Sequence, residues 1–152
     1  MEKEPTENKF ELLLTKAIAW VEKQSAIILK DGKSLNSTEM NLVKASGVVH
    51  PELVRILEVP ALPLPDDAEL QEATISNGLL GPNMVGLTLG YGIYICHGHR
   101  NNRLVSHELR HVFQYECAAS ISNFLTDYLK QINTFGYSKA PLEIDAQKHE
   151  QH

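Results

Sequence analysis

LVSHELRHVFQYE, at residues 104–116, is the stretch of this sequence that decides which fold and chemistry to expect. Its apolar residues recur at helical spacing, on the side of the helix away from His107 and His111. On such a helix the two histidines stand one turn apart on the same face, and Glu108 lies beside them. One face is therefore predicted to be buried and the other to hold a metal ion, as in zinc hydrolases. An amphipathic helix with two solvated histidines is the alternative.

The chain has the size and composition of one globular domain. It holds 152 residues, of which 43% are hydrophobic and 22% are charged, and a chain of this size can build a core without staples. We expect a single domain over 1–152. Within it, 1–77 form an N-terminal portion of helices and a strand, 78–146 form the core around the motif, and 147–152 form a polar tail that frays.

Charge and hydropathy argue against several kinds of partner. The formal net charge is -5 and the basic residues are dispersed, so no basic stripe is available for nucleic acid. No apolar run approaches the length that crosses a bilayer, which argues against a membrane. The stretch MEKEPTE at 1–7 is charged and acidic, whereas a secretory signal has a basic start and an apolar segment. We therefore expect a cytoplasmic location.

Helical and strand patterns follow one another along the chain. Capping and breaking residues such as Asn36, Gly47 and Pro141 mark where helices begin and end. The patterns predict a mainly helical α+β fold in which a small β-sheet or hairpin precedes the motif helix. The expected elements are a helix over 7–30, a short helix over 37–46, a strand over 53–59, a helix over 66–76, a β-hairpin or bent strand over 86–95, the motif helix with helical structure continuing through Ile132, a break at 135–137 and a new helix from Pro141.

A catalytic zinc ion needs a third protein ligand and one open position. Glu143 is the candidate, because Pro141 places it near the start of a helix that the break at 135–137 allows to fold back on the motif helix. Its alternative role is that of an acid stabilised at a helix N-terminus. Glu116 competes, but it lies about 140° around a continuous helix from His111 and should not face the same ion. A carboxylate that supports one of the ligands, or a surface charge, is the more plausible role for Glu116.

The HExxH motif at 107–111, followed by PLEIDA at 141–146, resembles the gluzincin group of zinc metallopeptidases. It is more closely similar to the small single-domain minigluzincins, and to uncharacterised bacterial domains that carry HExxH with a following Gln-rich helix. The resemblance covers 78–146, and the N-terminal half matches no family. It implies a zincin-like fold, a peptide or protein substrate, and Zn²⁺ held by His107, His111 and Glu143.

The resemblance also implies roles for neighbouring residues. Glu108 would be the general base that takes a proton from a zinc-activated water. Tyr137, just before the Glu143 helix, is a candidate donor to the oxyanion, with simple packing as its alternative. The strand over 87–95 fits the strand that lies along the substrate cleft, and near 91–95 it can pair, as an edge strand, with an extended peptide.

A second group of potential ligands precedes the motif. Cys96, His97 and His99 place a thiol and two imidazoles within one short segment, and these donors suit zinc. They can form a second site or contribute to the first. A loop between a strand and a helix is the alternative.

Two other functions stay open. A zinc-stabilised, non-catalytic scaffold or protein-interaction module would keep the ligands for folding and have no turnover. In the other, the acidic N-terminal helix binds a partner protein and the motif is incidental. Glu108 favours catalysis, because a purely structural zinc site has no need of this carboxylate.

Overall fold

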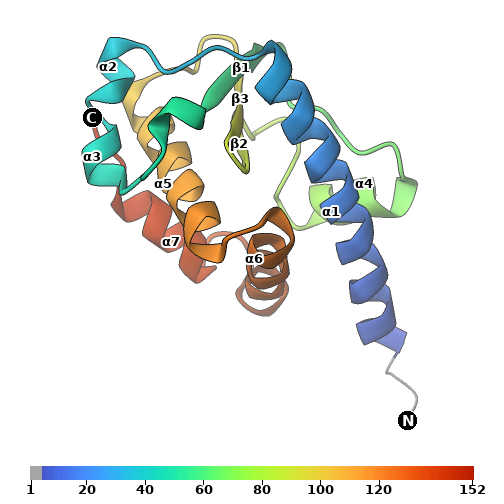
Figure 1. The fold of residues 1–152 in the computed structure, drawn as a ribbon. Coiled ribbons are helices and arrows are strands. Elements are labelled where there is room, and N and C mark those ends of the chain that lie inside the picture. The colour runs from blue at the N-terminus through green and yellow to red at the C-terminus, as the bar shows by residue number, and fades with distance from the viewer. Residues whose placement is uncertain (1–4) are drawn as a thin grey trace.

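The computed structural model describes residues 5–152, with side chains described from Lys9 onward. Helices surround a small sheet, with α1 along one side and α5 and α7 next to each other (Figure 1). This is a mainly helical α+β fold with a small mixed sheet, as expected. The elements are α1 (Pro5–Asp31), α2 (Ser37–Met40), α3 (Val43–Ser46), the 3-10 helix η1 (Pro51–Leu53), β1 (Arg55–Val59), α4 (Ala68–Ser76), β2 (Gly86–Leu89), β3 (Gly92–Cys96), α5 (Asn102–Ala118), α6 (Ile121–Phe135) and α7 (Pro141–Lys148).

The three strands form one mixed sheet in the order β1-β3-β2. β2 and β3 are an antiparallel hairpin, one of the two forms predicted for 86–95, and Gly90 has the positive φ of 71° that its turn requires. β1 pairs in parallel with β3 along its whole length. The prediction of an edge strand at 91–95 is therefore wrong, because a strand from much earlier in the chain covers that side of β3. β3 is central and fully buried, and β2 lies at an edge.

α1 packs closely on the sheet. A Cβ built on Gly92 of β3 would lie 2.9 Å from Ile28 Cβ, so glycine permits this approach. The helix ends at Asp31, close to the predicted position. Neither α1, at 27 residues, nor any other described helix combines the length and apolar character that a membrane crossing demands.

The apolar face of α5 is buried, as predicted, and it packs against the sheet. Val105, Leu109 and Val112 are 1%, 0% and 0% exposed, and they share a core cluster with Ile93 and Ile95 of β3. A second core cluster joins α1, the sheet, α5 and α6. The sheet and α5 therefore share a core, and the histidine face of α5 turns toward α7.

Two helices differ from the sequence predictions. The segment 37–46 forms two short helices, α2 and α3, instead of one. The expectation of helix continuing unbroken from the motif through Ile132 is also wrong. α5 ends where Ala119 takes a left-handed φ of 74°, and the Ser120 side chain accepts from the Asn123 backbone N–H to begin α6. This break folds α6 back beside α5.

The tail at 147–152 does not fray. Its first residues belong to α7, and Gln151 donates from its backbone N–H to Ser106 Oγ (2.7 Å) and from its side chain to Leu42 O (2.9 Å). The prediction failed because polar side chains bond to polar groups on α5 and its neighbours as well as to water.

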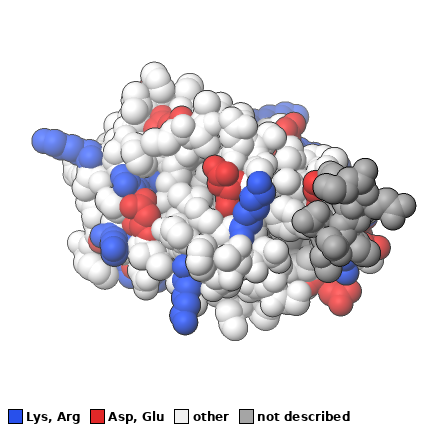
Figure 2. Space-filling model, turned by 90° about the horizontal axis from the view of Figure 1, so that it is seen from below, with Lys and Arg blue, Asp and Glu red and all other residues white. Residues whose placement is uncertain are grey.

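Charged side chains are interspersed on the face shown in Figure 2, where Lys and Arg lie among Asp and Glu. Lys16 of α1 forms an ion pair with Asp67, the N-cap of α4, at 2.8 Å. Pairs of this kind contribute little stability, since both groups are partly hydrated.

Candidate metal centre

α5 and α7 bring the three predicted ligands together. His107 and His111 come from one face of α5, and Glu143 stands in the first turn of α7 behind Pro141. One ligand atom from each of the three lies within 4.8 Å of the others. Glu143 Oε1 is 3.2 Å from His107 Nε2, and Glu143 Oε2 is 2.9 Å from His111 Nε2. The helix from Pro141 thus folds back on the motif helix as predicted.

This cluster is buried. The side chains of His107, His111 and Glu143 are 14%, 8% and 7% exposed. Ionisable groups are rarely buried unless a partner compensates for their lost hydration. The alternative from the sequence was an amphipathic helix with two solvated histidines. This alternative is wrong, because both histidines lie largely out of contact with solvent.

His107, His111 and Glu143 strongly shift one another's pKa values. Burial disfavours the charged imidazoles, but hydrogen bonds with Glu143 outweigh burial, so the pKa of His107 is raised to about 9 and that of His111 is also raised. Burial would likewise raise the pKa of Glu143, yet its bonds with His107 and His111 hold this pKa well below the ordinary value. The hydrogen bonds with Glu143 therefore favour the protonated form of both imidazoles. A metal ion must displace those protons, because only neutral imidazole is a ligand.

Gln114 fixes the orientation of His111. Gln114 Nε2 donates to Leu142 O and to Asp145 Oδ2, each at 2.9 Å. Because both partners are acceptors, the amide oxygen of Gln114 must face His111 Nδ1, 2.7 Å away. His111 Nδ1 therefore donates, and Nε2 is the nitrogen available to a metal. Metal-binding histidines usually have their far nitrogen bonded in this way.

Glu150 fixes the orientation of His107 in the same way. Its Oε2 lies 2.8 Å from His107 Nδ1, and a carboxylate can only accept, so Nδ1 donates and Nε2 faces Glu143. Glu150 was not predicted as a site residue, because the polar tail that contains it was expected to fray. No local spacing pattern links two residues that are 43 positions apart.

Glu108 lies beside the cluster and next to β2. It is 4% exposed, and its Oε1 accepts a hydrogen bond from Thr88 Oγ1 at 2.7 Å. A Cβ on Gly86 would lie only 3.0 Å from Glu108 Oε2, so the glycine leaves room for this oxygen. The carboxylate borders the same pocket as His111 and Glu143. Its position is thus set by β2 as well as by the motif helix.

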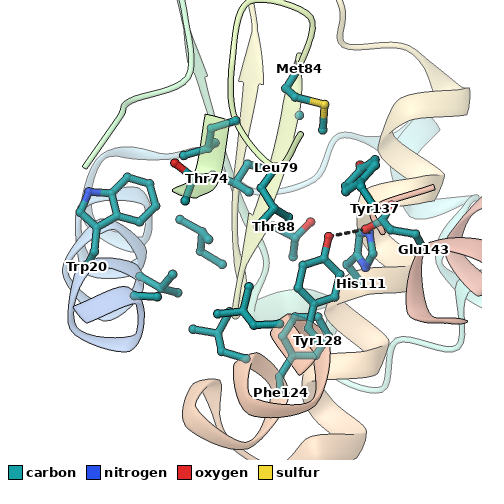
Figure 3. Close-up of a pocket in the computed structure, with 18 of the residues that line it drawn as sticks. Trp20, Thr74, Leu79, Met84, Thr88, His111, Phe124, Tyr128, Tyr137 and Glu143 are labelled. Atoms are coloured by element: carbon teal, nitrogen blue, oxygen red, sulfur yellow. Dashed lines mark hydrogen bonds and ion pairs between the residues drawn. The ribbon is translucent and has the colours of Figure 1, made fainter. Parts of the chain in front are cut away.

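Two tyrosines lie at the carboxylate of Glu143. Tyr128 Oη donates to Glu143 Oε2 at 2.6 Å, and Tyr137 lies on the same side of the pocket (Figure 3). Burial is the main cause that raises the pKa of both phenols above the ordinary value, and the charge of Glu143 is the second. Both tyrosines therefore keep a proton to donate. Tyr137 is a predicted site residue. Tyr128 was missed because the break before α6 was missed, although Ser120 is a helix-starting residue that could have indicated it.

Glu116 faces another part of the molecule. Its carboxylate accepts from the backbone N–H groups of Val49 (2.8 Å) and His50 (3.0 Å) and from the Tyr91 hydroxyl (2.8 Å). It joins the loop after α3 to the β2–β3 turn. This is a structural role, in agreement with the helical geometry that argued against Glu116 as a ligand.

The segment that contains Cys96, His97 and His99 does not reach the cluster. Cys96 is buried at the end of β3, and both histidines are exposed. Among the described residues, these three belong to no group of three or more donors that can hold one ion. The loop interpretation therefore describes this segment.

A pocket opens beside the buried cluster (Figure 3). His111, Tyr128, Tyr137 and Glu143 lie at one side of it, and mostly apolar side chains form the remainder. The cluster therefore meets a space that a ligand can enter, although its side chains are buried.

The arrangement defines a candidate metal centre of two imidazoles and one carboxylate, with a further carboxylate and two phenols beside it. Neither a protein-family model, nor a curated protein, nor a solved structure matches this chain.

Proposed function

We propose that this chain is a zinc-dependent peptidase of the gluzincin type, with a zincin-like fold, that hydrolyses peptide bonds in peptides or proteins. The observation that carries the proposal is the convergence of His107 Nε2, His111 Nε2 and the Glu143 carboxylate. Each histidine is held from behind by an acceptor, and Glu108 lies beside the convergence point.

The donor set fits zinc. Two imidazole nitrogens and one carboxylate form a known ligand set of catalytic zinc, which keeps a further position open. In the part of the chain that the structure describes, no fourth His, Cys, Asp or Glu joins the three. The pocket borders His111 and Glu143. Three ligands, two of which border a pocket, support a catalytic centre, because a structural zinc site normally takes four protein ligands.

Glu108 is the proposed general base. A zinc ion in this centre would polarise the peptide carbonyl and make a water acidic enough to attack it. Glu108 takes the proton of the attacking water onto its carboxylate and gives it to the departing amine. Thr88 occupies Oε1 of this carboxylate, which leaves Oε2, the oxygen near Gly86, to receive the proton.

The two phenols have different tasks. Tyr137 is the proposed donor to the carbonyl oxygen as negative charge develops on it. Its proton is retained at neutral pH, because burial and the charge of Glu143 raise its pKa. Tyr128 is engaged with Glu143 through its 2.6 Å hydrogen bond and orients that ligand.

A zinc-stabilised scaffold without turnover is the second candidate. Ion pairs between α5 and α7 favour it, since Arg110 Nε lies 2.7 Å from Asp145 Oδ2 and Glu143 pairs with both histidines. A scaffold, however, gains nothing from Glu108, a buried carboxylate whose desolvation costs free energy. Substitution of Glu108 distinguishes the two candidates.

Zinc binding and peptide cleavage by the Glu108→Gln variant test the proposal. Metal-free protein is titrated with zinc against a chromophoric chelator, and cleavage of a mixture of peptides is followed by mass spectrometry. The parent chain should bind one zinc ion and cleave peptides, and Glu108→Gln should bind zinc equally well and cleave about 10²–10⁴-fold more slowly. Glu72→Gln, on the exposed side of α4, is the matched control and should retain both properties.

Three other results would contradict the proposal or part of it. Equal cleavage by Glu108→Gln would remove the general-base role. Zinc binding without cleavage by the parent chain would assign the scaffold. A chain with no affinity for zinc would exclude both candidates.

A further inference from the structure

The pocket beside the candidate metal centre is walled by segments that lie far apart in the sequence. Trp20 of α1 forms one side, and His111, Tyr128 and Glu143 lie across the pocket from it (Figure 3). Thr74 of α4 contributes to the wall near Trp20. The N-terminal half of the chain therefore builds the wall that faces the centre, although it contributes none of the three ligands.

The wall is chemically apolar. In the described part of the chain, no charged residue lines the pocket besides Glu108, His111 and Glu143. Thr74 Oγ1 donates to Gln71 O at 2.9 Å, so its hydroxyl is bonded within α4. The wall away from the centre stabilises an apolar occupant and penalises a charged one, because it offers no charged partner in exchange for the lost hydration.

The size of the pocket limits what it can hold. Its volume is about 90 Å³, which exceeds the ~10–15 Å³ that one water requires and is less than the ~150 Å³ of an apolar cavity that binds benzene. A branched group of about three or four carbons fits between these limits. The side chains of valine and leucine have this size, and aromatic rings exceed it.

We propose that this pocket receives a branched aliphatic side chain of the substrate next to the cleaved bond, and that Trp20 and Thr74 limit this side chain to about the size of leucine. The inference rests on the proposed function and adds its substrate class. Peptides with valine, leucine or isoleucine at this position are good substrates, whereas those with phenylalanine, lysine or aspartate are poor ones.

Trp20 provides a direct readout, because it is the single tryptophan of the chain and it lines the pocket. Zinc-loaded protein is titrated with acetohydroxamate, isovalerohydroxamate and phenylacetohydroxamate, and binding is followed by Trp20 fluorescence and by calorimetry. All three share the zinc-chelating group and differ in the part that enters the pocket. Isovalerohydroxamate should bind tighter than acetohydroxamate by on the order of tenfold to hundredfold, since it buries three more carbons. Phenylacetohydroxamate should bind no tighter than acetohydroxamate.

Substitutions in the wall should change this preference. Thr74→Phe fills the pocket and should abolish the advantage of isovalerohydroxamate. Thr126→Phe is the matched control, because Thr126 also donates to the preceding turn of its helix (2.8 Å to Ser122 O) but does not line the pocket. Trp20→Ala enlarges the pocket and, measured by calorimetry, should let phenylacetohydroxamate bind at least as tightly as isovalerohydroxamate. Equal affinities for acetohydroxamate and isovalerohydroxamate in the parent chain overturn the inference, as does a preference that survives Thr74→Phe.

Zinc-free protein separates this inference from the proposed function. Isovaleramide and acetamide lack the chelating group, and isovaleramide should change Trp20 fluorescence at lower concentration than acetamide does. If no hydroxamate binds through zinc while the isovaleramide preference persists, the metal centre fails and the aliphatic selectivity of the pocket stands. If all hydroxamates bind alike, the metal centre stands and the inference fails.

Discussion

Glu150 Oε2 lies 2.8 Å from His107 Nδ1, so the first histidine of the HExxH motif is oriented by a residue 43 positions further along the chain. Glu150 itself is held by neighbours on both sides: Arg103 Nη1 lies 3.5 Å from its other oxygen, and Gln151 donates to Ser106. The segment after α7 is therefore part of the candidate metal centre.

We predict that Glu150→Ala weakens zinc affinity by about 10–100-fold, the usual effect of removing a group that orients a ligand. Glu150→Gln keeps an acceptor for His107 Nδ1 and should restore most of the affinity. The exposed neighbour Lys148 supplies the control, since Lys148→Ala should leave affinity unchanged. Competition with a chromophoric chelator measures all three, and full affinity in Glu150→Ala would show that His107 needs no such support.

Glu143→Ala should weaken zinc binding by at least about tenfold, because it removes one of three ligands and leaves two buried histidines without their carboxylate. His97→Ala and His99→Ala change exposed residues outside the cluster and should have no effect. Competition with the chromophoric chelator measures the zinc affinity of all three variants. Unchanged affinity in Glu143→Ala, or a loss in either histidine variant, would mean that the third ligand lies elsewhere.

Gly86→Ala tests the placement of the general base. The new Cβ would lie 3.0 Å from Glu108 Oε2 and 3.0 Å from Leu104 Cδ1, so the carboxylate must move. Small displacements of catalytic groups cost up to about 10²-fold in rate. Peptide cleavage should therefore fall while zinc affinity stays the same, because no ligand is touched. Loss of both would indicate a general disturbance of β2 and α5.

Tyr137→Phe should lower kcat by about 10²-fold if the phenol stabilises the oxyanion, with little change in KM or zinc affinity. Tyr91→Phe is a suitable control, since Tyr91 donates to Glu116 away from the centre. Steady-state kinetics on one cleaved peptide distinguish the two variants. An unchanged kcat in Tyr137→Phe would leave Tyr137 as a packing residue.

The acid stability of the fold should depend on Glu39. Burial opposes ionisation of this carboxyl, but hydrogen bonds from Arg100 (2.7 Å) and the Asn36 backbone (2.9 Å) outweigh burial and lower its pKa below the ordinary value of 4.5. A group whose pKa is lower in the folded state stabilises the fold above its unfolded pKa and loses this effect as the pH falls through its folded pKa.

Urea unfolding of the parent chain and of Glu39→Gln should therefore differ by roughly 2 kcal/mol near pH 7. This difference should shrink as the pH falls below 4.5, the ordinary pKa of a glutamate carboxyl. Glu58→Gln alters the more exposed partner of Arg100, at 3.3 Å, and should cost less than about 1 kcal/mol. A difference that is constant from pH 7 to pH 3 would contradict the role of the ionised carboxyl.

The motif helix and the start of the last helix could be predicted because both rest on local rules. The spacing of His107 and His111 places both imidazoles on one helix face, and Pro141 can begin a helix with Glu143 in its first turn. The apolar face of α5 follows from the same periodicity. These features depend on residues within a few positions of one another, so the sequence alone was sufficient for them.

Only the tertiary structure decided what surrounds those residues. β1 made β3 a central strand, the turn at Ala119 brought Tyr128 to Glu143, and Glu150 reached His107 across 43 positions. The pocket, likewise, needs Trp20 from α1 to face a centre built from α5 and α7. Such contacts form when separate elements bury their apolar faces together, and no spacing within one element determines which distant side chain will meet it.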